Sequence, residues 1–360
     1  MKSVLIITDV PFWRSGTGNR ERIARLVAFL TKTIHITIAY VGMGSDKDDG
    51  QLRGFDVRLV YLDRNMVLKS AEYGKRVTEL VKANRFDACI IEYVHNSYFL
   101  NYLPREIAKF LDLHDLLSDR IQGFSAFNRR DVFEDISPEI EREIFGLYDY
   151  LICICEPDLH AMRPFFDKNK LILTPHAPGF NKRVCREHLK TIGYLASEYF
   201  PNVDGINKFL QQCWPILARK SSVHLEICGN VGKYVMPVEY SERVHIGGYI
   251  DDIEYFYEKI DAVINPVEYG AGIKIKNVEA LANSIPLVTT MHGARGMEDG
   301  VDKAFFVATS NQSFVERLIR LTSDDRLRRE ISEAAYEFAV DNFSPDSCYR
   351  LLTETICNLE

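Results

Sequence analysis

The sequence predicts an α/β protein of two domains, each built on an open, doubly wound parallel sheet. Its 360 residues suit two domains of roughly 150–200 residues each better than one core. Apolar runs typical of strands alternate with amphipathic stretches typical of helices, which favours parallel sheets. This alternation restarts after residues 171–181, LILTPHAPGFN, whose prolines and glycine predict an interdomain connection.

In the first half, Ser3–Thr8 reads SVLIIT, a continuous apolar run that predicts a strand covered on both faces. The next apolar residues recur at helical spacing and predict a helix with one apolar face: Ile23, Leu26, Val27 and Leu30. Further strands are expected at 34–40, 56–62, 87–93, 110–113 and 149–155. Helices are expected over 70–83 and from Ser137-Pro138, where serine caps and proline occupies the first turn.

The second half repeats the pattern. Strands are expected at 190–196, 224–229, 243–249, 261–266, 286–290 and 305–308. Helices are expected over 203–217, 274–283, 311–322, 324–341 and 345–357. Ligands of such sheets bind beyond the carboxyl ends of the strands, so site residues are sought there.

Composition narrows the class of protein. The chain is 46% hydrophobic and 26% charged, as in a soluble globular protein. A net charge of -7 supplies no overall basic field, so no nucleic-acid partner is expected. Eight cysteines lack metal-type spacing, and Cys153 and Cys155 in YLICIC are interpreted as buried thiols. The N-terminal apolar run is too short for a membrane span and lacks the small-residue cleavage site of a signal peptide, so a first strand is expected there. We expect a cytoplasmic protein, with peripheral membrane contact left open.

The stretch 265–290, NPVEYGAGIKIKNVEALANSIPLVTT, is the most specific in the chain. Gly270 and Gly272 predict a tight turn between a strand and a helix, where backbone N–H groups and the helix N-terminus attract an anion. Lys274 and Lys276 add cationic groups, and Glu279 on the same helix can accept two ribose hydroxyls. An ordinary loop and a surface helix fit the same spacing.

This stretch resembles the donor-site signature of retaining GT-B glycosyltransferases of family four. The segments SEYFPNVDGINKFLQQCWPIL (197–217), HLEICG (224–229) and VHIGGYIDDI (244–253) resemble a subgroup of the same family. The resemblance implies two Rossmann-like domains facing each other across a cleft. Residues 1–178 would be the acceptor-side domain and 179–343 the nucleotide-sugar domain. Residues 344–360 would form a helix that packs back on the first domain.

The resemblance also implies site residues. Glu279 takes the position of the family's ribose-binding glutamate, and Lys276 that of the subgroup's retained lysine. Ala271 stands where the family usually has its first glutamate, and Tyr194–Phe200 lacks the usual basic pair. The expected donor-binding residues are Gly16, Thr17, Gly18, Tyr249, Gly270, Ala271, Gly272, Ile273, Lys274, Lys276 and Glu279.

Gly16, Thr17 and Gly18 lie between the first strand and the first helix. The sixth position of a dinucleotide fingerprint here would be Glu21 rather than glycine, which disfavours an NAD site. The loop instead resembles the glycine loop that faces the donor phosphates in the family. An ordinary strand–helix turn is the alternative.

His114 and Asp115 directly follow the strand 110–113. A histidine there can hydrogen-bond a donor-sugar hydroxyl, and the pair resembles the family's "H-D" pattern. We therefore expect His114, Asp115, Lys276 and Glu279 to act in catalysis. The spacing of Asp112 and Asp115 is not Asp-x-Asp, and the resemblance implies an enzyme without a catalytic metal, so no metal and no other cofactor is expected. Three other histidines are expected to be structural: His95, His176 and His292.

The resemblance implies a hexosyl-type glycosyltransferase that moves a sugar from a nucleotide diphosphate to a glycan or lipid-linked acceptor, with retention. Two alternatives remain: a GT-B nucleotide-sugar epimerase, and a catalytically degenerate nucleotide-binding partner of another transferase. Ala271 and the missing basic pair are what favour the degenerate protein.

Overall fold

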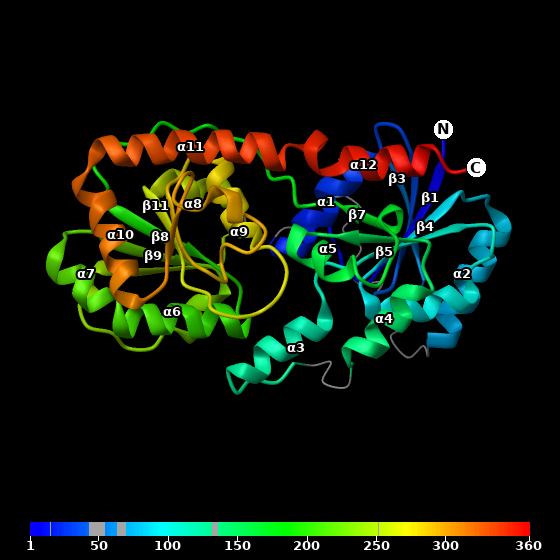
Figure 1. Cartoon of the computed structure of the whole chain (residues 1–360), viewed down its shortest axis with the longest axis horizontal. Helices are drawn as coiled ribbons and strands as arrows, with labels where there is room; N and C mark the ends of the chain where they lie inside the picture. The colour runs from blue at the N-terminus through cyan, green and yellow to red at the C-terminus, as the bar shows by residue number, and fades with distance from the viewer. Residues whose placement is uncertain (15, 43–54, 63–69, 132–135, 251) are drawn as a thin grey trace. The chain divides into compact units, whose positions relative to one another are not determined.

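The computed structural model describes residues 1–14, 16–42, 55–62, 70–131, 136–250 and 252–360. The chain divides into two compact units (Figure 1). The first contains residues 1–122, 131–177 and 345–360, and the second contains 123–130 and 178–344. The chain thus passes from the first unit to the second after residue 177, and the C-terminal helix belongs to the first unit.

Within the described residues of the first unit, seven strands form one parallel sheet in the order β3-β2-β1-β4-β5-β6-β7. The strands are β1 (Ser3–Thr8), β2 (His35–Tyr40), β3 (Val57–Tyr61), β4 (Ala88–Glu92), β5 (Ala108–Asp112), β6 (Tyr150–Cys153) and β7 (Leu171–Leu173). Register pairs Glu92 with Asp112 at the carboxyl ends of β4 and β5. These two acidic residues are therefore neighbours at the sheet edge where ligands of such sheets bind.

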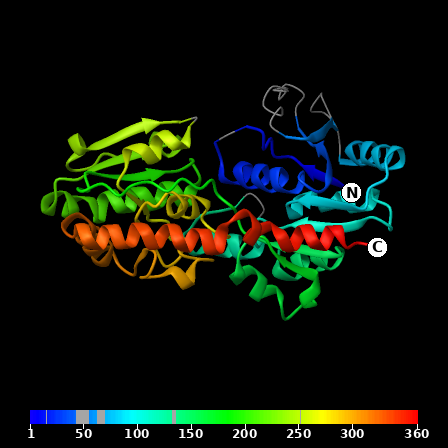
Figure 2. The ribbon, with the colours of Figure 1, turned by 90° about the horizontal axis from the view of Figure 1, so that it is seen from above.

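Helices cover both faces of this sheet. Its helices are α1 (Gly18–Leu30), α2 (Ser70–Ala83), η3 (Val94–Tyr102), α3 (Leu117–Ala126, whose last turn belongs to the second unit), α4 (Pro138–Gly146), α5 (Glu156–Met162), η4 (Lys168–Lys170) and α12 (Pro345–Cys357). One apolar cluster joins the sheet to α2, η3, α4 and α5. On the other face α1 packs against α12, with the rings of Phe29 and Tyr349 5.5 Å apart. Both chain ends lie in this unit (Figure 2), where Lys2 Nζ donates to Leu359 O at 2.7 Å.

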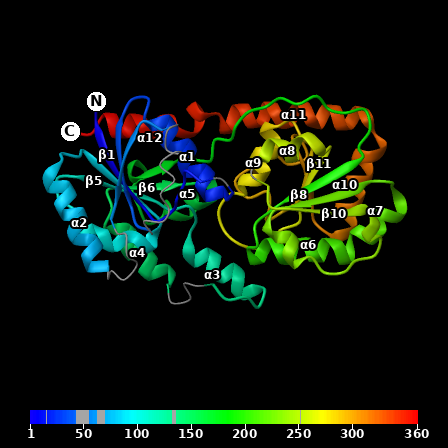
Figure 3. The same cartoon turned by 180° about the vertical axis from the view of Figure 1, so that it is seen from behind.

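The described residues of the second unit form a six-stranded parallel sheet in the order β10-β9-β8-β11-β12-β13. The strands are β8 (Thr191–Leu195), β9 (His224–Cys228), β10 (Val244–Gly248), β11 (Ala262–Asn265), β12 (Leu287–Thr290) and β13 (Phe306–Ala308). The helices are α6 (Phe200–Gln212), α7 (Trp214–Lys220), η5 (Asn230–Tyr234), η6 (Ser241–Arg243), α8 (Ile253–Lys259), α9 (Ile275–Ala282), η7 (Glu298–Gly300), α10 (Asn311–Ser323) and α11 (Asp325–Phe343). Figures 1 and 3 show α8, α9 and α11 on one side of this sheet and α6, α7 and α10 on the other.

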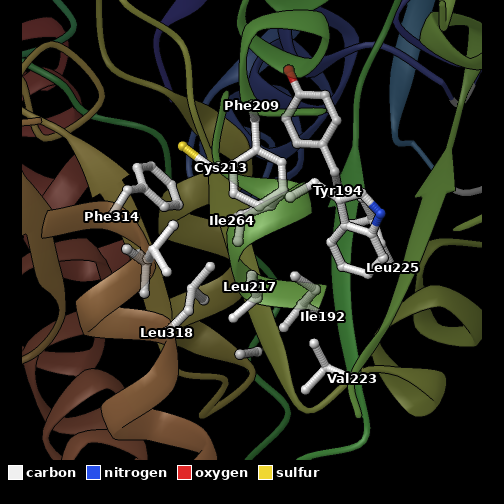
Figure 4. Close-up of a cluster of buried hydrophobic side chains, with 14 of the residues drawn as sticks. Ile192, Tyr194, Phe209, Cys213, Leu217, Val223, Leu225, Ile264, Phe314 and Leu318 are labelled. Atoms are coloured by element: carbon white, nitrogen blue, oxygen red, sulfur yellow. The ribbon is translucent and has the colours of Figure 1, made fainter. Parts of the chain in front are cut away.

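The core beneath α6, α7 and α10 fixes the strands that carry the site. Phe209 of α6, Leu217 of α7 and Leu318 of α10 converge on Ile192 and Ile264 of the sheet (Figure 4). All five side chains are buried. Burial of each large apolar side chain contributes about 1.5–3 kcal/mol, so β8 and β11 have a rigid base.

The structure confirms the predicted GT-B class at the level of two Rossmann-like parallel sheets. Two element predictions were wrong. Leu171–Leu173, predicted to be part of the connection, pairs with β6 as strand β7. The single helix predicted over 203–217 is two helices, because Pro215 in the first turn of α7 cannot donate a hydrogen bond to the preceding turn.

Residues 123–130, which the sequence had placed in the first domain, cluster with the second unit. Aromatic and ionic contacts explain this. Phe127 stacks on Tyr269 with ring centroids 4.4 Å apart. Arg129 forms two hydrogen bonds to the carboxylate of Asp204, which also accepts a hydrogen bond from the Tyr269 hydroxyl.

Candidate functional site

The predicted anion loop lies between β11 and α9 in the second unit. Gly270 and Gly272 have φ of 116° and 63°, values that L side chains rarely adopt, which explains the glycines. Lys274 is the N-cap residue of α9, its side chain makes no capping hydrogen bond to the helix, and the first turn of α9 has no acidic residue. The N–H groups of that turn thus have no capping side chain, and the helix dipole favours an anion there.

The two lysines of the loop have different roles. Lys274 Nζ donates to the carbonyls of Ala271 at 3.1 Å and Gly272 at 2.9 Å, so it holds the loop closed on itself. Lys276 Nζ donates to Asn202 Oδ1 at 2.7 Å and lies 4.7 Å from the ring centre of Tyr194. Burial, assisted by the charge of Lys274, lowers the pKa of Lys276 to about 7, against the influence of Glu279. A bound anion would reverse part of that shift.

Glu279 lies one helical turn after Lys276 on α9 and is partly exposed. The hydroxyl of Tyr257, on α8, is hydrogen-bonded to the Glu279 carboxylate. Burial first, and then the charge of Glu279, raise the pKa of Tyr257 well above its ordinary value. Tyr257 therefore stays protonated and donates, which orients the carboxylate.

A buried amide network connects the loop to the neighbouring strands. Asn265 Nδ2, at the end of β11, donates to Asn277 Oδ1 at 2.8 Å. Asn277 Nδ2 donates to Gly293 O at 2.8 Å, and Thr289 Oγ1 donates to Asn265 O at 2.9 Å. All three side chains are completely buried. Because such groups are costly to leave unpaired, this network fixes the start of α9 relative to β11 and β12.

Segment 123–130 contacts the same loop within the second unit. A Cβ added at Gly123 would lie 3.4 Å from Gly270 N and 3.5 Å from Gly270 O. Together with the contacts to Tyr269 and Asp204, this close approach places backbone of 123–130 directly against the predicted anion loop. Glu268, by contrast, forms an ion pair with Lys208 of α6 at 2.6 Å, so its carboxylate is already paired.

The glycine loop of the first unit leads into α1. Gly16 has φ of 113°, and Thr17 caps α1 without a side-chain hydrogen bond to the helix. Thr17 Oγ1 donates instead to Asn19 Oδ1 at 2.6 Å, and Asn19 Nδ2 donates to Tyr93 Oη at 3.1 Å. The loop is therefore tied to the residue that follows β4.

His114 and Asp115 follow β5 as predicted, but they face different partners. His114 Nε2 lies 2.6 Å from Glu92 Oε2, and the His114 ring stacks on Tyr93 at 4.0 Å. His114 has φ of 58°, a conformation that costs about 1–3 kcal/mol in a non-glycine residue and is often found at functional sites. The Asp115 carboxylate accepts two hydrogen bonds from Arg120.

Glu92, Asp112 and His114 each place a ligand-type atom within 4.8 Å of the others, as in a metal site. Other contacts account for this spacing. Arg22, completely buried, pairs with Asp112 Oδ2 and donates to Thr174 O at 3.1 Å. The guanidinium supplies the positive charge that these carboxylates need, so the donor set does not fit a cation.

The structure brings together Gly270, Ala271, Gly272, Ile273, Lys274, Lys276 and Glu279 in the second unit. Gly16, Thr17, Gly18, His114 and Asp115 belong to the first unit. Tyr249 directly follows β10, which β9 and β8 separate from β11, and its side chain is half exposed. Participation of these groups in one site stays a prediction.

Sequence reasoning missed several residues. It did not find Asn202 and Tyr194, which are the partners of Lys276, and it did not find the amide network. These residues come from strands and helices that are distant in sequence. It also missed Glu92, whose position at the end of the apolar run ACIIE was a usable signal. His292 is partly buried, and burial lowers its pKa to about 3, so it is neutral.

Comparisons with known proteins agree with this architecture. Residues 189–324 match the family model described as Glycosyl transferases group 1. A Klebsiella pneumoniae protein called "Uncharacterized 44.6 kDa protein in cps region" is 23% identical over 95% of this chain and 96% of its own length. Sucrose-phosphate synthase from Thermosynechococcus elongatus has a TM-score of 0.79 at 14% identity, covering 100% of this chain and 99% of that one. Anabaena HepE in complex with UDP-glucose has a TM-score of 0.71 at 14% identity, covering 100% of both chains.

The fold is thus that of GT-B glycosyltransferases, and the second unit contains the match to the Glycosyl transferases group 1 model. The family match supports glycosyl transfer as the activity of this chain. Among the described residues, no helix is both long enough and apolar enough to cross a membrane.

Proposed function

We propose that this chain transfers a hexose from a nucleotide diphosphate sugar to a hydroxyl of a glycan or lipid-linked acceptor, with retention of configuration. The observation that carries this proposal is the loop of Gly270 and Gly272 before α9, with Lys276 and Glu279 on one helix. An anion-binding turn, a lysine and a carboxylate in this order match the parts of a nucleoside diphosphate: diphosphate first, ribose next.

The chemistry follows from charge. As the sugar–phosphate bond breaks, the sugar gains positive character and the diphosphate gains negative charge. The N–H groups at the start of α9, the helix dipole and Lys276 stabilise that departing charge. Because these groups would stabilise the charge of the diphosphate, the proposed reaction needs no metal and no other cofactor.

The first unit is proposed to supply the acceptor side. His114 would hydrogen-bond the sugar, with Asp115 beside it, and the Gly16–Gly18 loop would face the donor phosphates. Anabaena HepE is described in complex with UDP-glucose, which makes UDP the first nucleotide to test. Polysaccharide biosynthesis is the process we propose, on the cytoplasmic side of the membrane and in peripheral contact with it.

Glu279→Ala and Lys276→Ala variants test this assignment. We expect both to remain folded and to lose transfer from nucleotide sugars, with weaker binding of sugar-free UDP or GDP. Lys208→Ala is the matched control, because it removes a lysine of the same unit that pairs with Glu268. Unchanged turnover in both site variants would refute the assignment.

A further inference from the structure

The His114 side chain is held at one nitrogen by a buried carboxylate. Glu92 is completely buried, and its Oε2 lies 2.6 Å from His114 Nε2. The His114 side chain keeps 6% exposure, and its Nδ1 forms no hydrogen bond with the residues that the structure describes. Nε2 is thus hydrogen-bonded to a buried side chain, and Nδ1 is the nitrogen that can bind a ligand.

The imidazole plane is fixed as well. The Tyr93 ring stacks on it at 4.0 Å with an interplanar angle of 10°, and Tyr93 Oη accepts a hydrogen bond from Asn19 Nδ2 at 3.1 Å. The left-handed backbone at Tyr93 and His114, with φ of 66° and 58°, turns both side chains at the strand ends. An outlier of this kind at neighbouring strand ends points to a functional constraint.

The charges around the pair determine its proton arrangement. Asp112 Oδ2 lies 4.0 Å from His114 Nε2 but is already paired with the buried guanidinium of Arg22. Burial first, and then the charge of Asp112, raise the pKa of Glu92, and the hydrogen bond to His114 and the charge of Arg22 lower it in part. The next residue, Asp115, is paired with Arg120 at 2.9 Å. Because Asp112 and Asp115 are paired with arginines, Glu92 Oε2 is the carboxylate oxygen that faces His114 Nε2.

We propose that Glu92 is a positioning residue that accepts a hydrogen bond from His114 Nε2–H and so presents Nδ1 as a hydrogen-bond acceptor. The hydrogen bond at one ring nitrogen decides which nitrogen carries the proton. An acceptor at Nδ1 selects a ligand group that donates, which means a hydroxyl of the bound sugar and not a sugar carboxylate. This inference rests on the proposed function and specifies the chemistry that His114 recognises.

Nitrogen-15 NMR of the full-length chain, labelled at histidine, tests the tautomer directly at pH 8. The His114 resonances are assigned by their loss in His114→Gln. We expect the wild-type chain to show protonated Nε2 and unprotonated Nδ1, and Glu92→Gln to show a mixture of tautomers. Protonated Nδ1 in the wild type, or an unchanged spectrum in Glu92→Gln, would overturn the proposal.

A matched control separates this effect from general loss of a carboxylate. Asp9 Oδ2 lies 3.0 Å from His95 Nε2 in the same unit, so Asp9→Asn breaks a second histidine–carboxylate pair. We expect Asp9→Asn to leave the His114 tautomer unchanged. A change as large as that in Glu92→Gln would mean that the tautomer responds to charge in general, contrary to the proposal.

Affinity for UDP-glucose and UDP provides the second readout. Glu92→Gln should weaken UDP-glucose binding about tenfold, the size expected for one hydrogen bond, and leave UDP binding unchanged. In a His114→Ala background the same change should have no effect, and an equal loss there would refute the positioning role. If Glu279→Ala does not weaken UDP binding, the proposed function fails. The positioning role of Glu92 fails separately, if the tautomer measurement gives protonated Nδ1 in the wild type.

Discussion

Lys276 should take up a proton when a diphosphate binds, because its pKa in the free chain is lowered to about 7. At pH 8 a group with that pKa is about nine-tenths deprotonated. An anionic charge about 4 Å away at an effective dielectric constant of about 20 contributes about 4 kcal/mol, or about 3 pKa units. The bound lysine would then titrate near pH 10, so binding at pH 8 should take up about 0.9 of a proton.

The sign of the pH dependence follows. Below pH 7 Lys276 is charged in both the free and the bound chain, so it contributes no pH dependence. Above pH 7 the free chain loses the proton and the complex keeps it, so affinity falls as pH rises. Between pH 7 and 9 the apparent dissociation constant should increase about 50-fold. Phosphate groups with a second pKa near 6 are already about nine-tenths ionised at pH 7, so they add little to this dependence.

Isothermal titration calorimetry of UDP at pH 8, in buffers of different ionisation enthalpy, counts the protons taken up. The wild type and Lys208→Met should give about 0.9, and Lys276→Met about zero. Lys208 is the control because it is a lysine of α6 that pairs with the Glu268 carboxylate. Uptake below about 0.2 in the wild type, or equal uptake in Lys276→Met, would refute the reasoning.

Three further predictions concern single side chains. Glu279→Ala should bind 2′-deoxy and 3′-deoxy UDP as well as UDP, whereas the wild type should prefer UDP about tenfold or more; competition binding measures this, and preserved discrimination would exclude the ribose role. Asn277→Ala leaves the buried Asn265 Nδ2 and Gly293 O without their partner and should lower the free energy of unfolding by about 1–3 kcal/mol. Urea denaturation measures this, and an unchanged free energy of unfolding would contradict a stabilising role for the network. Arg22→Met leaves Asp112 buried without its partner and should cost about 3–5 kcal/mol; adding Asp112→Leu should restore most of it, and an additive loss would argue against the pair.

The fold was predictable from sequence because its strands are short, apolar and regularly spaced. Ser3–Thr8 matches β1 residue for residue, and Ser137 caps α4 by accepting from Ile140 N as predicted. The predicted buried thiols Cys153 and Cys155 are fully enclosed, and burial raises the pKa of Cys153. Periodicity alone was enough in these segments.

Short elements were harder to predict. Helices α5 and α8 have seven residues each, too few for a clear helical period. Strand β7 has three residues and lies before two prolines, which made the segment look like a connection. The break between α6 and α7 depended on one proline inside an otherwise helical pattern.

The candidate site shows a similar division. The anion loop could be predicted because glycines, lysines and a glutamate are adjacent in sequence. The contacts that tune it could not, since Asn202 lies 74 residues from Lys276 and Glu92 lies 22 residues from His114. Such pairings depend on strand order, which local patterns do not encode.

A crystal structure of the chain with sugar-free UDP, and another with GDP, would test the central claim most directly. The account predicts the diphosphate at the N–H groups that open α9, within hydrogen-bond distance of Lys276 Nζ, and the ribose hydroxyls at the Glu279 carboxylate. A nucleotide bound away from residues 270–279 in both crystals would contradict it.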